Sequence, residues 1–256
     1  MPGDCCFVTH HTHGGLLGTP TLRLGVLEAM TTSMKTIRAV ATAAALALPA
    51  IAGAQQGADA AYERVAKAWA ATKTLDANFE QKITNPMIGK TATSRGRFLQ
   101  QRPGKVSITF TDPAGDQIVD DGTNLWVYLP SSTPGQVLKL PSTADGAIVA
   151  DLLGQLLDTP RKNFTISGGE SSTIDGKATK RVQLVPKVNG SAPFSKAVLW
   201  LDDASARPVR VQVIDGQGID RTITLTSWSP DAALPANAFK FSVPKGAKVS
   251  TKLPGL

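Results

Sequence analysis

The chain has 256 residues, enough for one large domain or two small ones, and its 42% hydrophobic and 18% charged residues are typical of a soluble protein. A formal net charge of +7 accompanies 23 glycines and 17 prolines, a turn-rich composition that favours short strands over long helices. All three histidines and both cysteines lie within residues 1–13. The rest of the chain therefore offers no histidine base, cysteine nucleophile or His/Cys metal site, and we predict no metal and no cofactor.

The first 54 residues are predicted to lie outside the fold. Residues 34–38 form a basic start, residues 39–52 an apolar run and Ala52-Gly53-Ala54 a small-residue exit, which is the pattern of a secretory signal peptide. The apolar run is too short to span a bilayer, and Pro49 interrupts it. Residues 34–54 are therefore expected to direct export.

This pattern divides the chain into three parts. Residues 1–33 precede the signal and are interpreted as an extension that arises from a start codon placed too early. A metal-binding tail, formed by His10, His11 and His13 with Cys5 and Cys6, is the competing interpretation, although export would discard it. Residues 55–256 are expected to form one domain.

The excess of basic residues does not indicate a nucleic-acid partner. Basic and acidic residues alternate along the chain, and no run of Lys or Arg exceeds two residues. Proteins that bind nucleic acid usually concentrate their positive charge on one face or in one segment. We therefore expect no nucleic-acid partner.

The exported part is predicted to begin with one amphipathic helix over residues 58–72. Its apolar residues recur at helical spacing and its charged residues occupy the opposite face. The apolar set is Tyr62, Val65, Ala66 and Trp69, and the charged set is Glu63, Arg64 and Lys67.

After this helix the hydrophobic period changes to two. Apolar and polar residues alternate over 75–83, 105–111, 209–213, 222–226 and 239–243. The turn signals between such segments include Asp121-Gly122, Asp175-Gly176, Asn189-Gly190 and Asp215-Gly216. We predict about nine to eleven strands, antiparallel and consecutive in sequence. Because every strand turns its apolar row to the same side, the sheet must curl around that side or be covered.

One segment breaks the strand pattern. Residues 144–157 place six apolar side chains on one helix face, namely Ile148, Val149, Leu152, Leu153, Leu156 and Leu157. Such a wide apolar stripe on a lone helix predicts either a lid for the curled sheet or a core helix that never moves. The pattern does not decide between the two.

The chain shows no pattern that indicates catalysis. The carboxylate pairs Asp120-Asp121 and Asp202-Asp203 lie at strand ends in turn-like sequence, where adjacent side chains point apart. A hydrolase that uses only carboxylates would need two of them facing each other in a cavity, and the strand periods place almost none inward. We therefore predict a binding protein and not an enzyme.

Four segments resemble a known family. They are Asn78-Phe79-Glu80-Gln81, the G-x-F-x(3)-R-P-G-K pattern of residues 96–105, the D-G-x-x-L-W-x-Y pattern of residues 121–128, and the F-x-F-x-x-P-x-G pattern of residues 239–246. In this order, behind a signal peptide, they resemble the outer-membrane lipoprotein carrier (LolA) family over nearly all of residues 55–256.

The resemblance implies a mainly β fold with an α lid, in which an unclosed antiparallel β-barrel encloses an apolar cavity. It also implies a periplasmic chaperone that works as a monomer. Such a chaperone takes acylated lipoproteins from an inner-membrane lipoprotein-releasing ABC transporter and passes them to an outer-membrane receptor lipoprotein. Because related proteins share the scaffold, a lipid or glycolipid carrier and a lipoprotein-sensing regulatory domain stay open as alternatives. Residues 129–147, rich in Pro, Ser and Gly, depart from the pattern at the entry to the lid.

The resemblance also implies the site residues. The acyl cavity is expected to be formed by Phe79, Phe98, Val106, Ile108, Phe110, Ile118, Trp126, Ile148, Leu152 and Leu156. Each of these could instead belong to a permanently packed core. Arg102 corresponds to an inward-facing arginine that bonds carbonyls of the lid and holds the empty form closed, whereas most arginines before a hairpin proline are solvated.

Overall fold

The computed structural model describes residues 57–143, 151–159 and 161–252. Contacts between Cα atoms divide the chain into residues 1–48 and residues 49–256, and every described residue belongs to the second unit. The predicted extension (1–33) and signal peptide (34–54) lie outside the described residues. Within the described ranges, no helix is both long and apolar enough to cross a membrane.

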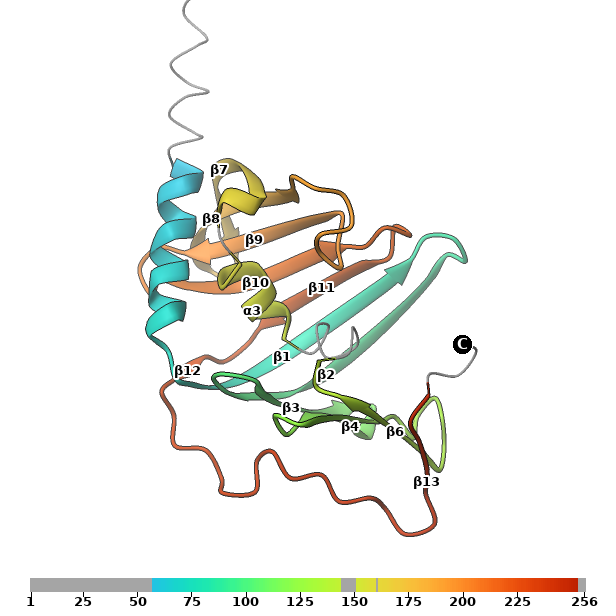
Figure 1. Cartoon of the computed structure of the whole chain (residues 1–256). Coiled ribbons are helices and arrows are strands. Elements are labelled where there is room, and N and C mark those ends of the chain that lie inside the picture. Colours follow the sequence, from blue (N-terminus) through green and yellow to red (C-terminus); the bar gives the residue numbers. More distant parts are fainter. Residues whose placement is uncertain (1–56, 144–150, 160, 253–256) are drawn as a thin grey trace, which may run out of the picture. The chain divides into compact units, whose positions relative to one another are not determined.

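The structure is dominated by one 13-stranded sheet (Figure 1). Its strands are β1 (Thr74–Asn85), β2 (Lys90–Gln101), β3 (Lys105–Asp112), β4 (Ala114–Asp120), β5 (Asn124–Tyr128), β6 (Gln136–Pro141), β7 (Phe164–Ile174), β8 (Lys177–Pro186), β9 (Lys196–Asp202), β10 (Arg207–Ile214), β11 (Asp220–Leu225), β12 (Ser229–Pro230) and β13 (Lys248–Ser250). Their order in the sheet is β13-β6-β5-β4-β3-β2-β1-β11-β10-β9-β8-β7, with β12 paired to β1. The short helix α3 (Leu152–Leu157) and a 3-10 turn (Arg161–Asn163) separate β6 from β7.

The sheet curls without closing. Antiparallel pairing of β11 with β1 joins the β1–β6 half to the β7–β11 half. The two end strands, β7 and β13, do not pair with each other among the described residues. The predicted mainly β, unclosed architecture is confirmed. Two details of the prediction are wrong. The sheet has 13 strands and not about nine to eleven, and β13 runs parallel to β6 while the other pairs are antiparallel.

Cross-strand rows explain which side of the sheet forms the core. Phe98 on β2 lies opposite Ile108 on β3, Ile108 lies opposite Ile118 on β4, and Ile118 lies opposite Val127 on β5. Side chains in one such row share a face of the sheet. The period-two pattern of the sequence thereby becomes a continuous apolar surface on the concave side.

A helix over residues 57–71 covers the core beside the sheet (Figure 1). Its inward side chains are at most 2% exposed and comprise Ala58, Ala61, Tyr62, Val65 and Trp69. On the opposite side, Arg64 pairs with Asp203 at 2.6 Å. The helix ends at residue 71, and the hydroxyl and amide of the next residue, Thr72, donate to the carbonyls of Ala68 and Trp69. The helix predicted from the spacing of its apolar residues is thus present, with bounds that differ by one residue.

The C-terminal segment corrects another prediction. Residues 239–243 alternate apolar and polar but form no strand, and the chain from residue 231 to β13 follows the outer side of the sheet, drawn in red in Figure 1. Phe241 stacks on Trp126 of β5 with ring centroids 5.4 Å apart. Strands β4–β6 also carry apolar side chains on this side, which include Val119 and Val137, so an extended segment can pack on the face of the sheet.

Candidate ligand-binding cavity

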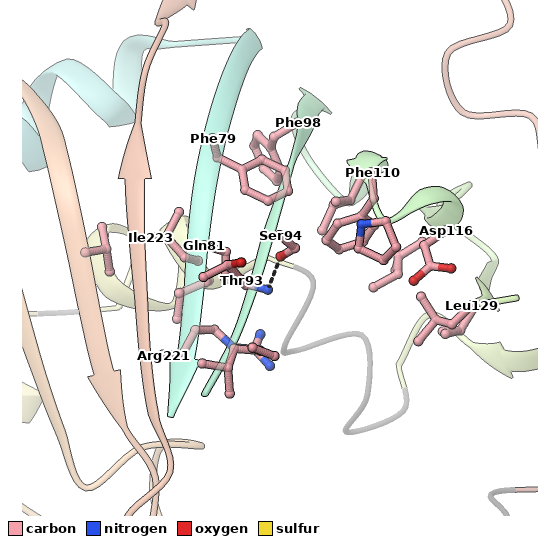
Figure 2. A pocket seen from close by; sticks show the side chains of 18 of the residues that line it. Phe79, Gln81, Thr93, Ser94, Phe98, Phe110, Asp116, Leu129, Arg221 and Ile223 are labelled. Atoms are coloured by element: carbon pink, nitrogen blue, oxygen red, sulfur yellow. Dashed lines mark hydrogen bonds between the residues drawn. The ribbon is translucent and has the colours of Figure 1, made fainter. Parts of the chain in front are cut away.

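The concave face of the sheet encloses a cavity of about 570 Å³, a volume typical of sites for small molecules and cofactors (Figure 2). Its walls come from strands β1 to β5, from β10 and β11, and from α3. The lining is mostly aliphatic and aromatic. Phe79 and Phe110, from β1 and β3, meet edge to face with ring centroids 5.7 Å apart.

Six of the ten residues expected at an acyl cavity line this space. They are Phe79, Phe98, Ile108, Phe110, Ile118 and Leu152. Five of them lie on β1 to β4, and Leu152 is the first residue of α3. The strand residues meet because alternation directs them to one face and the curl of the sheet brings distant strands together.

Gly96 makes room for one of these rings. It lies opposite Phe79 across the β1–β2 pair. A Cβ at this position would lie 2.9 Å from the Phe79 ring and 2.4 Å from the carbonyl oxygen of Thr109. The absence of a side chain at Gly96 therefore allows the Phe79 ring to approach the backbone of β2 at the cavity wall.

The structure places three of the other expected residues elsewhere. Val106, 2% exposed, and Leu156, fully buried, belong to the packed core and do not line the cavity. Trp126 points to the outer face, because its strand neighbours Leu125 and Val127 take the inward positions. Ile148 lies outside the described residues.

Helix α3 is fixed to the core by polar contacts at both ends. At its start, Asp151 accepts a hydrogen bond from the amide of Gly154 at 3.0 Å and another from the side-chain amide of Gln100 at 2.9 Å. At its end, the buried hydroxyl of Tyr62 donates to the carbonyl of Leu156 at 2.8 Å. These contacts tie the helix to β2 and to helix 57–71.

Burial changes the ionisation of two of these groups. Desolvation raises the pKa of the Asp151 carboxyl group, against the opposing effect of its hydrogen bonds to Gly154 and Gln100. Desolvation, with a smaller effect of Glu63, raises the pKa of Tyr62 to about 12. The Tyr62 hydroxyl therefore keeps its proton and donates a hydrogen bond at neutral pH, whereas burial makes the ionised form of Asp151 less favourable.

Arg102 lies where helix 57–71 ends and α3 ends. Its guanidinium donates to the carbonyl of Trp69 and to the carboxylate of Asp158, the residue that caps α3, and approaches the carbonyl of Thr72 at 3.4 Å. It also lies 4.7 Å from the centre of the Trp69 ring. A cation there is favoured because helix carbonyls converge at a C-terminus. Among the described residues, the carbonyls that Arg102 bonds are those of Trp69 and Thr72 at the end of helix 57–71, and its contact with the α3 side is the Asp158 carboxylate, which differs from the lid carbonyls implied by the resemblance.

Several polar residues of the cavity were not predicted. Arg221, Gln81 and Ser94 lie on one wall, where Gln81 donates to Ser94 at 3.1 Å (Figure 2). Asp116 lies in the wall formed by β4 and accepts from the amide and hydroxyl of Ser131. The signal for Arg221 was present in the sequence, because alternation places it on the same face as Ile223 and Leu225.

The carboxylate pairs serve turns, as predicted. Asp120 accepts from the amide of Gly122, and Asp202 accepts from the amide of Ala204, each at 2.9 Å. Asp121 accepts from the indole of Trp126 on the outer face. Among the described residues, no three His, Cys, Asp or Glu side chains gather in a way that could hold a metal ion.

The amino-acid sequence is similar to those of known proteins. The family model for "Outer membrane lipoprotein carrier protein LolA" matches residues 70–242. An outer-membrane lipoprotein carrier protein from Chromobacterium violaceum is 31% identical over 217 residues, which cover 84% of this chain and 98% of that protein. The corresponding protein of Methylobacillus flagellatus is 30% identical over 70% of this chain and 82% of its own. A crystal structure of a LolA superfamily protein from Nitrosomonas europaea has a TM-score of 0.38 and 15% sequence identity, and the match covers 72% of this chain and 97% of that one.

Proposed function

The chain belongs to the outer-membrane lipoprotein carrier protein family, and on this premise we propose that it carries lipoproteins through the periplasm by enclosing their acyl chains in the cavity. It receives them from an inner-membrane lipoprotein-releasing ABC transporter and passes them to an outer-membrane receptor lipoprotein. It acts as a monomeric chaperone and catalyses no reaction. The observation that carries this proposal is the apolar cavity on the concave face of the sheet.

The size of the hydrophobic effect explains why a carrier needs such a cavity. A sixteen-carbon acyl chain in water carries a hydrophobic cost of about 12 kcal/mol, at roughly 0.8 kcal/mol per CH₂ group. A protein in an aqueous compartment can remove this cost only by covering the chain. The phenylalanines of β1, β2 and β3, together with Ile108 and Ile118, offer the chain an apolar surface in place of lipid.

The protein has no energy source with which to release its cargo, so release requires that the cargo-free form of the protein also be low in free energy. In the structure α3 contributes Leu152 and Leu153 to the cavity wall, and polar contacts fix both ends of the helix. We propose that α3 moves aside for cargo and returns when cargo leaves. Its return re-forms contacts that offset part of the loss of the acyl chains.

Arg102 is proposed to act as the latch of this empty form. Its contacts reach two elements that must separate if α3 is displaced, namely the end of helix 57–71 and Asp158. A guanidinium is suited to this role because its fixed donors can bond a carbonyl and a carboxylate at once. Movement of α3 would break the bond to Asp158 while the bond to Trp69 could stay.

The test of the carrier function uses spheroplasts that hold a labelled lipoprotein destined for the outer membrane. The purified protein is added, and the soluble fraction is examined for a one-to-one complex with the lipoprotein. We expect such a complex. Absence of the complex, while a neutral fluorescent probe still binds the cavity, would contradict the carrier proposal and favour a sensor or glycolipid carrier on the same scaffold.

The latch is tested with Arg102→Leu in the same assay. We expect this variant to accept lipoprotein but to transfer it to the receptor more than tenfold more slowly, because closure of α3 is no longer favoured. The matched control is Arg97→Leu, which removes an ion pair with Asp76 (2.6 Å) on the exposed sheet face. Transfer by Arg102→Leu at the wild-type rate would rule out the latch.

A further inference from the structure

One wall of the apolar cavity carries a positive charge. Arg221 on β11 lies opposite Ile83 on β1 and opposite Val213 on β10, so it shares the inward face with these apolar residues. Figure 2 shows it on the same wall as Gln81 and Ile223. Desolvation lowers the pKa of its guanidinium, although an arginine stays charged at neutral pH.

The guanidinium of Arg221 has no hydrogen-bond or ion-pair partner in the described part of the chain. The carboxylates near it are occupied by other donors. Asp215 accepts from the amides of Gln217 and Ile219, and acts on Arg221 only through space. Asp220, the neighbour in sequence, accepts from Gln212 and Thr222.

Asp116, the acidic residue of the cavity lining, is likewise engaged. Its two carboxylate oxygens accept from the amide and the hydroxyl of Ser131. A half-buried charge without a partner is unfavourable, and its cost falls when an opposite charge binds. The described part of the protein therefore leaves a donor group in the cavity without an acceptor.

The strand register places this donor at one end of the apolar surface. Phe79 pairs with Leu225, and four residues along β1 Ile83 pairs with Arg221. At roughly 3.3 Å per residue, these two rows are about 13 Å apart. The intermediate row contains Gln81, which lies opposite Ile223 and Ser94. The wall therefore changes from aromatic through polar to cationic along one direction.

We propose that the cavity binds lipids with an anionic head group, whose carboxylate or phosphate oxygens accept hydrogen bonds from Arg221 while the acyl chain lies against the phenylalanines. This proposal rests on the proposed function, because it requires that the cavity accept acyl chains. It adds a second class of ligand, since acyl chains held in ester or amide linkage carry no charge. A guanidinium bonds carboxylate and phosphate alike, so both belong to the proposed class.

The test compares three ligands with the same chain, namely dodecanoate, dodecyl phosphate and dodecanol. Each displaces a neutral fluorescent probe, N-phenyl-1-naphthylamine, from the purified protein. Wild type is compared with Arg221→Met, which keeps an unbranched apolar side chain. The control is Arg210→Met, because Arg210 lies on the outer face, where it bonds Thr224 and approaches the Trp200 ring.

We expect Arg221→Met to bind one or both anionic ligands at least about tenfold more weakly than wild type, because a charge-assisted hydrogen bond is lost. The affinity for dodecanol is expected to be unchanged. Dodecanoate and dodecyl phosphate distinguish the two head groups, and selective loss for either supports the proposal. Equal affinity of both anions for wild type and Arg221→Met would overturn it while leaving the carrier proposal intact. If dodecanol fails to displace the probe from wild type, the acyl cavity itself is refuted, and the head-group proposal with it.

Discussion

The carboxylate of Asp151 combines two opposing roles at the start of α3. It caps the helix by accepting from Gly154, and burial raises its pKa. The side-chain oxygen of Gln100, which is buried nearby, has no partner among the described residues. A protonated Asp151 could donate to it, whereas an ionised one cannot.

The raised pKa of Asp151 determines how the stability of the protein changes with pH. The folded protein holds the Asp151 proton more tightly than the unfolded chain, so this group contributes stability below its unfolded pKa, and the contribution is lost as pH rises through the folded pKa. Asp151→Asn keeps the acceptor for Gly154 and removes the titration. We expect the free energy of unfolding of Asp151→Asn, minus that of wild type, to increase between about pH 4 and about pH 7, as measured by urea unfolding. A difference that is constant with pH would contradict this.

At the scale of single residues, alternation predicted much of the cavity. Phe79, Ile108 and Ile118 are inward residues of amphipathic strands, and the structure places them in the lining. Trp126 was assigned to the cavity by resemblance, although its own strand period places it opposite to Val127. Arg221 is not predictable in the same way, because a charged residue usually faces solvent, whereas here the curl of the sheet encloses its end of β11.

At the scale of the secondary-structure elements, α3 is divided between a core side and a cavity side. Leu156 is fully buried, whereas Leu152 is partly exposed and lines the cavity. Truncation of a fully buried leucine leaves a void that the surroundings fill only in part. The two leucines therefore give a matched pair on one helix.

We expect Leu156→Ala to lower the free energy of unfolding by about 2–5 kcal/mol, the usual range for a buried leucine. Leu152→Ala is expected to cost about 1 kcal/mol, because less of its surface is withdrawn from water. Urea unfolding of both variants measures the difference. Equal costs would contradict the division of α3 into a core side and a cavity side.

The C-terminal segment offers a separate test of the two faces of the sheet. Phe241→Ala removes the stack on Trp126 on the outer face, whereas Phe110→Ala removes a ring from the cavity. We expect Phe241→Ala to lower the melting temperature but to leave the affinity for dodecanol unchanged. The affinity is expected to change with Phe110→Ala. An affinity change in Phe241→Ala as large as that in Phe110→Ala would show that the two faces are not independent.

Helices and strands are predictable from the sequence where one of their faces packs on the core. The helix over 57–71 and the long strands follow from their apolar periods. Residues 239–243 mislead because alternation requires only that one side of an extended segment be covered, and packing on a sheet face satisfies this as well as pairing at an edge. The pairing of β1 with β11 joins residues far apart in sequence, and no local pattern specifies such a partner.

At the scale of the whole molecule, the curl of the sheet creates a concave apolar surface larger than one helix can cover. Helix 57–71 packs on the core cluster, and α3 covers part of the remaining surface. The cavity is what these two helices leave open. Access to the cavity therefore depends on the short helix α3, which a few polar contacts tie to β2 and to helix 57–71.

The most direct test of the central claim, that acyl chains occupy this cavity, is site-specific photocrosslinking. One variant carries Phe110→p-benzoylphenylalanine, on the cavity wall, and its matched control carries Trp126→p-benzoylphenylalanine, on the outer face. Each is loaded with a lipoprotein bearing labelled acyl chains and irradiated. The account predicts acyl crosslinks at position 110 and none at position 126. Crosslinks at position 126 with none at position 110 would contradict it.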